Sequence, residues 1–544
     1  SEMAVAAEMG ELTESLGGEA WNCTNEWFMD RGISAIMSGI VGLFMLGLLS
    51  AIDTKPVNMA HIEGGWVHCA GSVTPWGNHL GSEEYPPDAK QWRDKTISEY
   101  NSYMAQYFGV EPEIDNDIVL NQDEIIAVMN PYDYGYTIEV DVKNFRKAKV
   151  VKHYSMGRVA IELSYVMPNE KTVYTSDDGS RVGLFRYEAD RKGDLSAGTL
   201  YAAKWTQTSP IYGVDERVAD DLRDGGAGTI SWVELGRATD QEIRDMIDSG
   251  VTFDDIFAEM PVSSCDTAGG YALIINRDTG ADGECLRVKD GMEKAAAFLE
   301  TSRYAGIMGA TTEWEKMEGI TLDSETNTMY LAMSRVINAM TDGAGDIMVP
   351  YNYCGTVYGL DLDENYVATN MYGVVSGLPR TESRGALVDN KYPEDGPYAS
   401  NNCDLNAISE PDNLSFIPGY HTLIIGEDTG QHQNDVIWAY NVELKESRFG
   451  TLGGVSLWND GRRVAEGGRE PRPLARLPEH HVPRRRAGAL PRGGPREGQA
   501  TRRASRRGLR HPPGQPRFGL RQRLQPVRSN LEGLRAGRRG LPAA

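Results

Sequence analysis

The chain has 544 residues, enough for several ordinary domains or for one large β-rich domain, and its hydrophobic content of 40% does not indicate general disorder. The formal net charge of −23 disfavours nucleic acid and anionic lipid as partners, and is typical of a secreted or cation-binding protein. The six cysteines form no C-x-x-C pair, which argues against a zinc ribbon or a thioredoxin-type site.

Residues 1–52 form an N-terminal segment. Its first 20 residues are acidic and small, without a basic n-region, so we do not expect an intact signal peptide. Within this segment, residues 32–52 carry no charge and are long enough to span a bilayer. The run is either a membrane anchor, which would associate the protein with a membrane, or two buried strands of a damaged first blade joined at a glycine. The sequence leaves both interpretations open.

A lone cysteine, Cys69, lies between an apolar Trp66-Val67 pair and a Gly/Pro-rich stretch that closes on the carboxylates Glu83 and Glu84. A layout of this kind recurs three times with an acid in place of the cysteine. In each case the acid stands ten residues before a threonine that opens a β-rich run: Glu162 and Thr172, Glu318 and Thr328, Asp412 and Thr422. Two of these runs end in acidic pairs, Asp177-Asp178 and Glu427-Asp428.

The distances between the repeated positions predict the fold. Cys69, Glu162, Glu318 and Asp412 are separated by 93, 156 and 94 residues, and a propeller blade takes roughly 40–50. We therefore expect two blades in each short interval, and two blades with a helical insertion around 238–300 in the long one. Equivalent positions of successive blades face one central channel. The prediction is an all-β fold, a six-bladed β-propeller over residues 53–455, in which these four residues converge.

Two helical segments are predicted inside the insertion, at residues 239–247 and 292–300. Cys265 and Cys285, also in the insertion, bracket a Gly/Asp-rich loop. They are either a disulfide, if the compartment is oxidising, or two free buried thiols.

The composition changes at residues 456–544. From residue 461 onward there are 22 Arg, five Glu and no Lys or Asp. This is either a basic tail for nucleic acid or for the acidic body, or the product of a GC-rich gene read out of frame, which is our hypothesis. In both cases we expect the tail to be disordered.

One thiolate among several carboxylates predicts a metal site that differs from structural zinc. If iron binds through Cys69 and calcium binds to the flanking acidic pairs, every residue of the set is a metal ligand. Such cations favour a phosphate ester as ligand, and Lys316, two residues before Glu318, could add a positive charge. The chain has no G-x-S-x-G, H-E-x-x-H or Walker motif, which disfavours serine-nucleophile and nucleotide-cradle mechanisms.

Several segments resemble the signature segments of the PhoX-type alkaline phosphatases, over about residues 53–446. They are HCAGSVTPWGNHLGSEE (68–84), KHYSMGRVAIE (152–162), TVYTSDDG (172–179), ATTEWEKMEGIT (310–321), TMYLAMS (328–334), GTVYGLDL (355–362), SEPDNLSF (409–416) and GEDTGQHQNDVIWAYN (426–441). The resemblance implies a six-bladed propeller, usually exported, which hydrolyses phosphate monoesters with ferric iron and calcium.

Carried over motif by motif, the resemblance implies a bridging thiolate at Cys69 and a phosphate-contacting base at Lys316. It implies iron carboxylates at Glu162, Glu318 and Asp412, and calcium carboxylates at Glu84, Asp178, Glu427 and Asp428. The sequence departs from the family at the apolar run, where a phosphate-binding asparagine cannot be placed, and at the Arg-rich tail.

The function expected from the sequence is hydrolysis of small phosphate monoesters by a secreted or periplasmic monomer, which is membrane-anchored if residues 32–52 span a bilayer. In this reaction Lys316, Glu318 and Cys69 would be catalytic. Two rivals remain: a non-catalytic calcium-binding surface propeller, and a calcium-dependent lactonase or esterase on a similar scaffold.

Overall fold

The structure, a computed structural model, describes residues 57–451 apart from 145–146, 214–224 and most of 381–400. The segment 1–52, with its apolar run, and the tail 456–544 lie outside the described residues, so the predictions for both remain predictions. Over the described range, no helix combines the length and the hydropathy needed to cross a bilayer.

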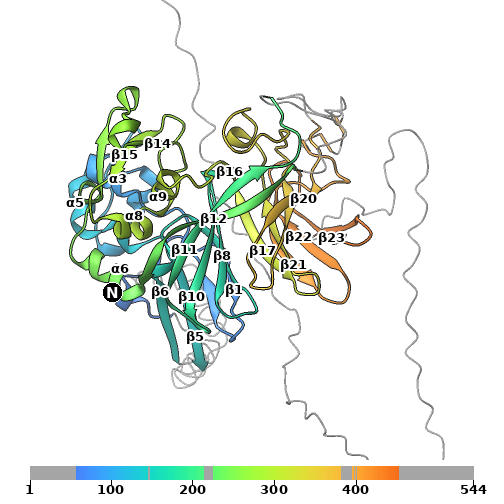
Figure 1. The fold of residues 1–544 in the computed structure, drawn as a ribbon, viewed down its shortest axis with the longest axis horizontal. Helices are drawn as coiled ribbons and strands as arrows, with labels where there is room; N and C mark the ends of the chain where they lie inside the picture. Colours follow the sequence, from blue (N-terminus) through green and yellow to red (C-terminus); the bar gives the residue numbers. More distant parts are fainter. Residues whose placement is uncertain are drawn as a thin grey trace, which may run out of the picture. The chain divides into compact units, whose positions relative to one another are not determined.

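The described chain is mostly β, and four antiparallel four-stranded units recur along it (Figure 1). In each unit the strands are paired in chain order. The first unit contains β1 (Ser72–Val73), β2 (His79–Gly81), β5 (Thr137–Asn144) and β6 (Lys147–His153). The second contains β7 (Ile161–Val166), β8 (Thr172–Asp177), β10 (Leu184–Arg191) and β11 (Asp194–Gln207). The third contains β17 (Met317–Asp323), β18 (Thr328–Met333), β19 (Thr356–Asp361) and β20 (Asn370–Ser376), and the fourth β21 (Pro411–Ile417), β22 (Thr422–Glu427), β23 (Val436–Asn441) and β24 (Glu446–Thr451).

A long strand, β12 (Ala227–Thr239), joins the second and third units into one nine-stranded sheet. β12 pairs along β11 and, through its first three residues, with β20. The two ends of this sheet, β7 and β17, lie next to each other, so the sheet nearly closes on itself.

The first strand of each unit lies at the centre of the arrangement. β7 lies beside β1 and β17, and β17 lies beside β21. Residues of all four strands line a cavity of about 490 Å³, among them Val73, Leu163, Ile320 and Leu414. All seven residues of β17 and five of the six in β7 are buried, because neighbouring strands cover both faces.

This arrangement corrects our interpretation of the intervals between the repeated positions. We expected two blades in each interval of 93 or 94 residues, but the structure places a single four-stranded unit there. The additional residues are insertions, which lengthen the interval without adding a blade. One insertion separates β2 from β5, and a long connection separates β20 from β21.

Two helical insertions pack together beside the first two units (Figure 1). The earlier one holds α3 (Ala89–Asp94), α4 (Glu99–Ser102) and α5 (Gln122–Val128). The later one holds α6 (Asp240–Asp248), α7 (Phe253–Ile256), α8 (Glu293–Leu299) and α9 (Thr301–Ile307). It also holds a small sheet in which β15 (Glu284–Val288) pairs with β13 (Phe257–Met260) and β14 (Ala272–Ile274). The predicted helices at 239–247 and 292–300 are α6 and α8. A capping box formed by Thr239 and Glu242 starts α6 at its predicted position.

Arg303 holds the two insertions together. Its guanidinium, 1% exposed, lies 3.1 Å from Asp88, 3.0 Å from Glu284 and 2.8 Å from Glu300. Asp88 is also the N-cap of α3, where it accepts a hydrogen bond from the Lys90 amide. A buried cation therefore fixes the start of one insertion against the other.

Two disulfides cross-link the described chain. Cys265–Cys285 confirms the disulfide interpretation over two free thiols, and Cys354–Cys403 was not predicted. Cys69 is free, the only such cysteine in the described residues, and it is exposed.

His153, at the end of β6, lies buried between Glu139 on β5 and Asp240 on α6, with nitrogen–oxygen distances of 2.9 and 3.2 Å. Burial lowers the pKa of His153, but hydrogen bonds and charges from Asp240 and Glu139 outweigh it and raise this pKa to about 9. The ion pair thus links the first unit to the later insertion.

This ion pair predicts a pH dependence of stability. Because the folded-state pKa is raised, the contribution of His153 is complete below about pH 6.5 and is lost as the pH rises through about 9. The shift corresponds to about 3 kcal/mol. We would measure the free energy of unfolding in urea between pH 6.5 and 10. We expect it to fall much less with rising pH in His153→Asn than in the wild type. In His421→Asn, which changes a surface histidine, it should fall as much as in the wild type. Equal pH slopes for His153→Asn and wild type would contradict the assignment.

Candidate metal centre

The repeated positions of the sequence lie at the start of the four central strands. Cys69 precedes β1, and Glu162, Glu318 and Asp412 are the second residues of β7, β17 and β21. Each of the three acids lies where the pairing of its strand with the next one shifts register. A β-bulge of this kind re-aims a side chain and is common next to active sites.

The side chains meet in two overlapping groups. Potential ligand atoms of Cys69, Glu84 and Glu162 all lie within 4.8 Å of one another, and so do those of Glu162, Glu318 and Asp412. Glu162 belongs to both groups, and its Oε2 accepts a hydrogen bond from Cys69 Sγ at 3.0 Å. The predicted convergence of the thiol and three acids is therefore present in the structure.

Close approach of β17 and β21 depends on Gly319, the residue after Glu318. A Cβ atom at this position would lie 2.7 Å from the Asp412 carbonyl oxygen. Any larger residue would push the two strands apart, and with them the carboxylates of Glu318 and Asp412.

The concentration of carboxylates is electrostatically unfavourable in the absence of cations. Burial, with neighbouring carboxylates, raises the pKa of Glu84 to about 8, of Glu162 to about 7 and of Asp412 to about 6. The pKa of Glu318 is raised well above its usual value for the same reasons. Cations bound among these groups would compensate both the lost hydration and the repulsion.

Two buried oxygens of this region have no hydrogen-bond partner within the described residues: Asp178 Oδ1 and Asp412 Oδ1. Buried carboxylate oxygens are rarely left unpaired, so these atoms fit metal ligands. The donor set, mostly oxygen with one sulfur, fits hard cations together with a transition metal.

Lys316 supplies a positive charge within the cluster. Its Nζ donates to Asp178 Oδ2 at 2.6 Å and lies 3.5 Å from Glu318 Oε1. Its backbone is left-handed, with φ of 48°, and is held by hydrogen bonds to Gly179 and from Ser334. Non-glycine residues in this conformation concentrate at functional sites.

Tyr85 also has positive φ, and its hydroxyl donates a short hydrogen bond to Asp178 Oδ2. The sequence did not single out Tyr85, although it directly follows Glu84. Tyr85 and Lys316 together satisfy one oxygen of Asp178, and the other oxygen remains available for a cation.

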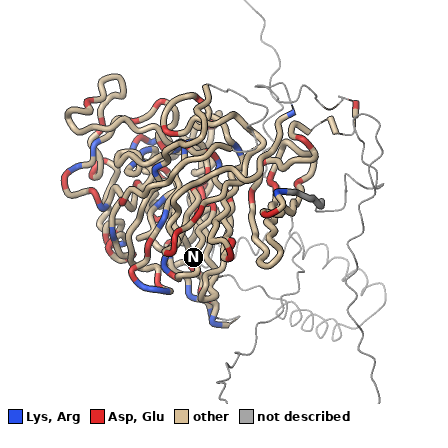
Figure 2. Tube along the Cα trace, turned by 45° about the vertical axis from the view of Figure 1, so that its right-hand side comes forward, with Lys and Arg blue, Asp and Glu red and all other residues tan. Residues whose placement is uncertain are grey.

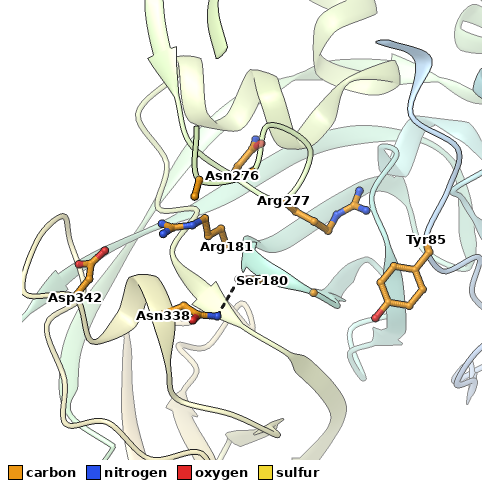
Figure 3. Close-up of a pocket in the computed structure, with 10 residues that line it drawn as sticks. Tyr85, Ser180, Arg181, Asn276, Arg277, Asn338 and Asp342 are labelled. Carbon is orange, nitrogen blue, oxygen red and sulfur yellow. Dashed lines mark hydrogen bonds between the residues drawn. The ribbon is translucent and has the colours of Figure 1, made fainter. Parts of the chain in front are cut away.

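A pocket of about 620 Å³ opens beside the cluster (Figure 3). Tyr85 and the backbone of Gly179, next to Asp178, form part of its wall. Arg181 and Arg277 line it as well, and neither was predicted, because both lie in segments that do not recur along the chain.

The family model described as alkaline phosphatase PhoX matches residues 49–463. The chain belongs to the PhoX alkaline phosphatase family. One similar solved structure is Pseudomonas fluorescens PhoX in complex with vanadate, a transition state analogue, at 16% identity and a TM-score of 0.43. The match covers 71% of this chain and 60% of that one, so this chain spans less than two thirds of the length of that protein. No curated protein matches the sequence.

The acidic pair at the end of β22 is divided in this PhoX-family chain. Glu427 is absent from both ligand groups, because its carboxylate accepts four hydrogen bonds within its own unit. The donors are Ser409 N, Trp438 Nε1, His432 Nδ1 and Val436 N. Asp428 is in neither ligand group, but its charge contributes to the raised pKa of Asp412. Of this acidic pair, only Asp428 therefore remains a candidate calcium ligand.

Proposed function

We propose that this chain hydrolyses phosphate monoesters at the cluster, using iron and calcium ions. The observation that carries the proposal is the meeting of Cys69, Glu162, Glu318 and Asp412 at the starts of four adjacent strands. These four residues would hold iron. Glu84, Asp178 and Asp428 would hold calcium, which prefers oxygen ligands.

Bound metal ions would hold the phosphate oxygens and stabilise the charge that develops on them. The chain itself contributes Lys316, whose ammonium group lies among the ligands and would neutralise a non-bridging oxygen. Tyr85 keeps its proton on Oη, where burial and Asp178 raise the pKa, and it orients Asp178. The pocket beside Tyr85 gives the alcohol part of the ester a place to lie.

The proposal extends to the fold and the compartment. Four units with adjacent first strands support a propeller, and we propose that it has six blades. Two disulfides support export to an oxidising compartment such as the periplasm or the cell exterior, where we propose that the protein acts as a monomer.

The test compares an aryl phosphate with a lactone on the purified full chain. We expect phosphate release that is lost on chelation and restored by iron with calcium, with no lactone hydrolysis. Calcium-dependent lactone hydrolysis without phosphate release would contradict the proposal. So would bound calcium without any hydrolysis, the result expected of a non-catalytic surface propeller.

A further inference from the structure

The pocket beside the cluster shares part of its wall with the metal centre. Tyr85 lines the pocket and donates to Asp178 Oδ2, the same oxygen that accepts from Lys316. The backbone of Gly179 also lines it, and accepts the Lys316 amide at 2.7 Å. The pocket and the metal centre therefore adjoin each other at Tyr85 and Gly179.

Arg181 is held by its backbone, and its side chain lines the pocket (Figure 3). Its amide donates to Glu315 Oε1 at 3.3 Å, and its carbonyl accepts the Arg277 amide at 2.9 Å. The backbone is left-handed, with φ of 63°. Two fixed contacts and a strained conformation position this residue, which is typical of a binding site.

The guanidinium of Arg181 has no carboxylate within 4.0 Å among the described residues, unlike that of Arg277, which pairs with Asp278 at 2.7 Å. Glu315 lies near enough for the charge of Arg181 to oppose the rise that burial causes in its pKa, but its side chain accepts hydrogen bonds from Ser180 and Asn338. An arginine that forms no close ion pair, at the wall of a concave pocket, is suited to an anionic oxygen of a ligand.

The other polar groups on the pocket wall are compatible with an anion. Asn276, Asn338 and Ser180 are neutral, with polar groups that are hydrogen-bonded within the protein, and Asp342 is the single acid among the ten lining residues. Asp342 accepts a hydrogen bond from the Ala344 amide, which turns part of its charge toward its own loop.

We propose that this pocket receives the leaving group of the ester, and that Arg181 recognises a second anionic group on it, a carboxylate or a further phosphate. This rests on the proposed phosphatase function. Arg181 would then be a specificity-determining residue that favours doubly anionic monoesters over monoesters of neutral alcohols.

The test uses substrates matched in size. Glycerol 3-phosphate and 3-phosphoglycerate share a carbon skeleton, and only the second carries a carboxylate. Fructose 6-phosphate and fructose 1,6-bisphosphate provide the same comparison for a second phosphate. In Arg181→Met, we expect kcat/KM for 3-phosphoglycerate or fructose 1,6-bisphosphate to fall by about 10- to 100-fold, the range of a charge-assisted hydrogen bond. The values for glycerol 3-phosphate and fructose 6-phosphate should change less than about threefold.

Two variants complete the design. Arg181→Lys should recover part of the lost kcat/KM, because it restores the charge without the planar fork. Arg191→Met removes an exposed arginine outside the pocket, which pairs with Asp194, and should behave as wild type. Equal losses on neutral and doubly anionic substrates, or no loss on either, would overturn the inference.

A binding measurement separates this inference from the proposed function. If the wild-type protein hydrolyses no ester, the proposed function fails, but calorimetry with 3-phosphoglycerate still reports on Arg181. Weaker binding by Arg181→Met than by wild type supports the anion site, and equal or undetectable binding by both overturns it.

Discussion

Glu162→Gln is expected to lower kcat/KM for an aryl phosphate by at least about 1,000-fold and to remove bound metal. Glu162 is the one residue shared by both ligand groups, so the substitution weakens two sites at once. A metal ion supplies several kcal/mol of transition-state stabilisation, and about 4 kcal/mol corresponds to roughly 1,000-fold in rate. Steady-state kinetics and elemental analysis of the same sample measure both effects.

Glu313→Gln is the matched control for this prediction. Glu313 is a partly buried carboxylate whose pKa burial also raises to about 7, but its oxygens accept the Asp346 and Ile347 amides, away from the cluster. We expect this variant to keep its metal and its activity. A Glu162→Gln protein with wild-type metal content would show that Glu162 is not a ligand.

Lys316→Met is expected to lower kcat by about 100- to 1,000-fold while the protein keeps its metal. Removing one donor to a developing negative charge costs about this much in other hydrolases. Lys316 lies within the cluster but is a cation, so it affects the reaction without serving as a ligand. Rate measurements at saturating substrate, together with metal analysis, distinguish this loss from that of Glu162→Gln.

Lys204→Met controls for the loss of an ion pair as such. Lys204 pairs with Asp346 at 2.6 Å, the same distance as Lys316 to Asp178, but lies outside both ligand groups. The Lys204→Met protein should retain full kcat, and Lys316→Arg should recover part of the activity that Lys316→Met loses. If Lys316→Met kept wild-type kcat, the proposed contact with the phosphoryl group would be wrong.

The sequence predicted the central residues because each acid stands at the same place in a repeated strand pair. The ten-residue interval from Glu162 to Thr172, and its two counterparts, spans the first strand and the turn into the second. Identical local structure therefore produced identical spacing, and the convergence followed from the symmetry of the repeated units.

Other features left no such pattern. The number of blades within each interval was misjudged, because insertions lengthen an interval as blades do. Glu427 and Asp428 are adjacent, and only the tertiary structure shows that the first is saturated by internal donors. Arg181 lies in a short segment that occurs once, and the Cys354–Cys403 pairing depends on contacts across 49 residues.

Iron-edge X-ray absorption on the purified protein tests the central claim most directly, since it reports which atoms bind the metal. The claim is that a thiolate and carboxylates from four repeated units hold iron together. We predict a sulfur neighbour of iron in the wild-type protein that is absent from Cys69→Ser. Iron surrounded by oxygen and nitrogen alone in the wild-type protein, or a protein that binds no iron, would contradict it.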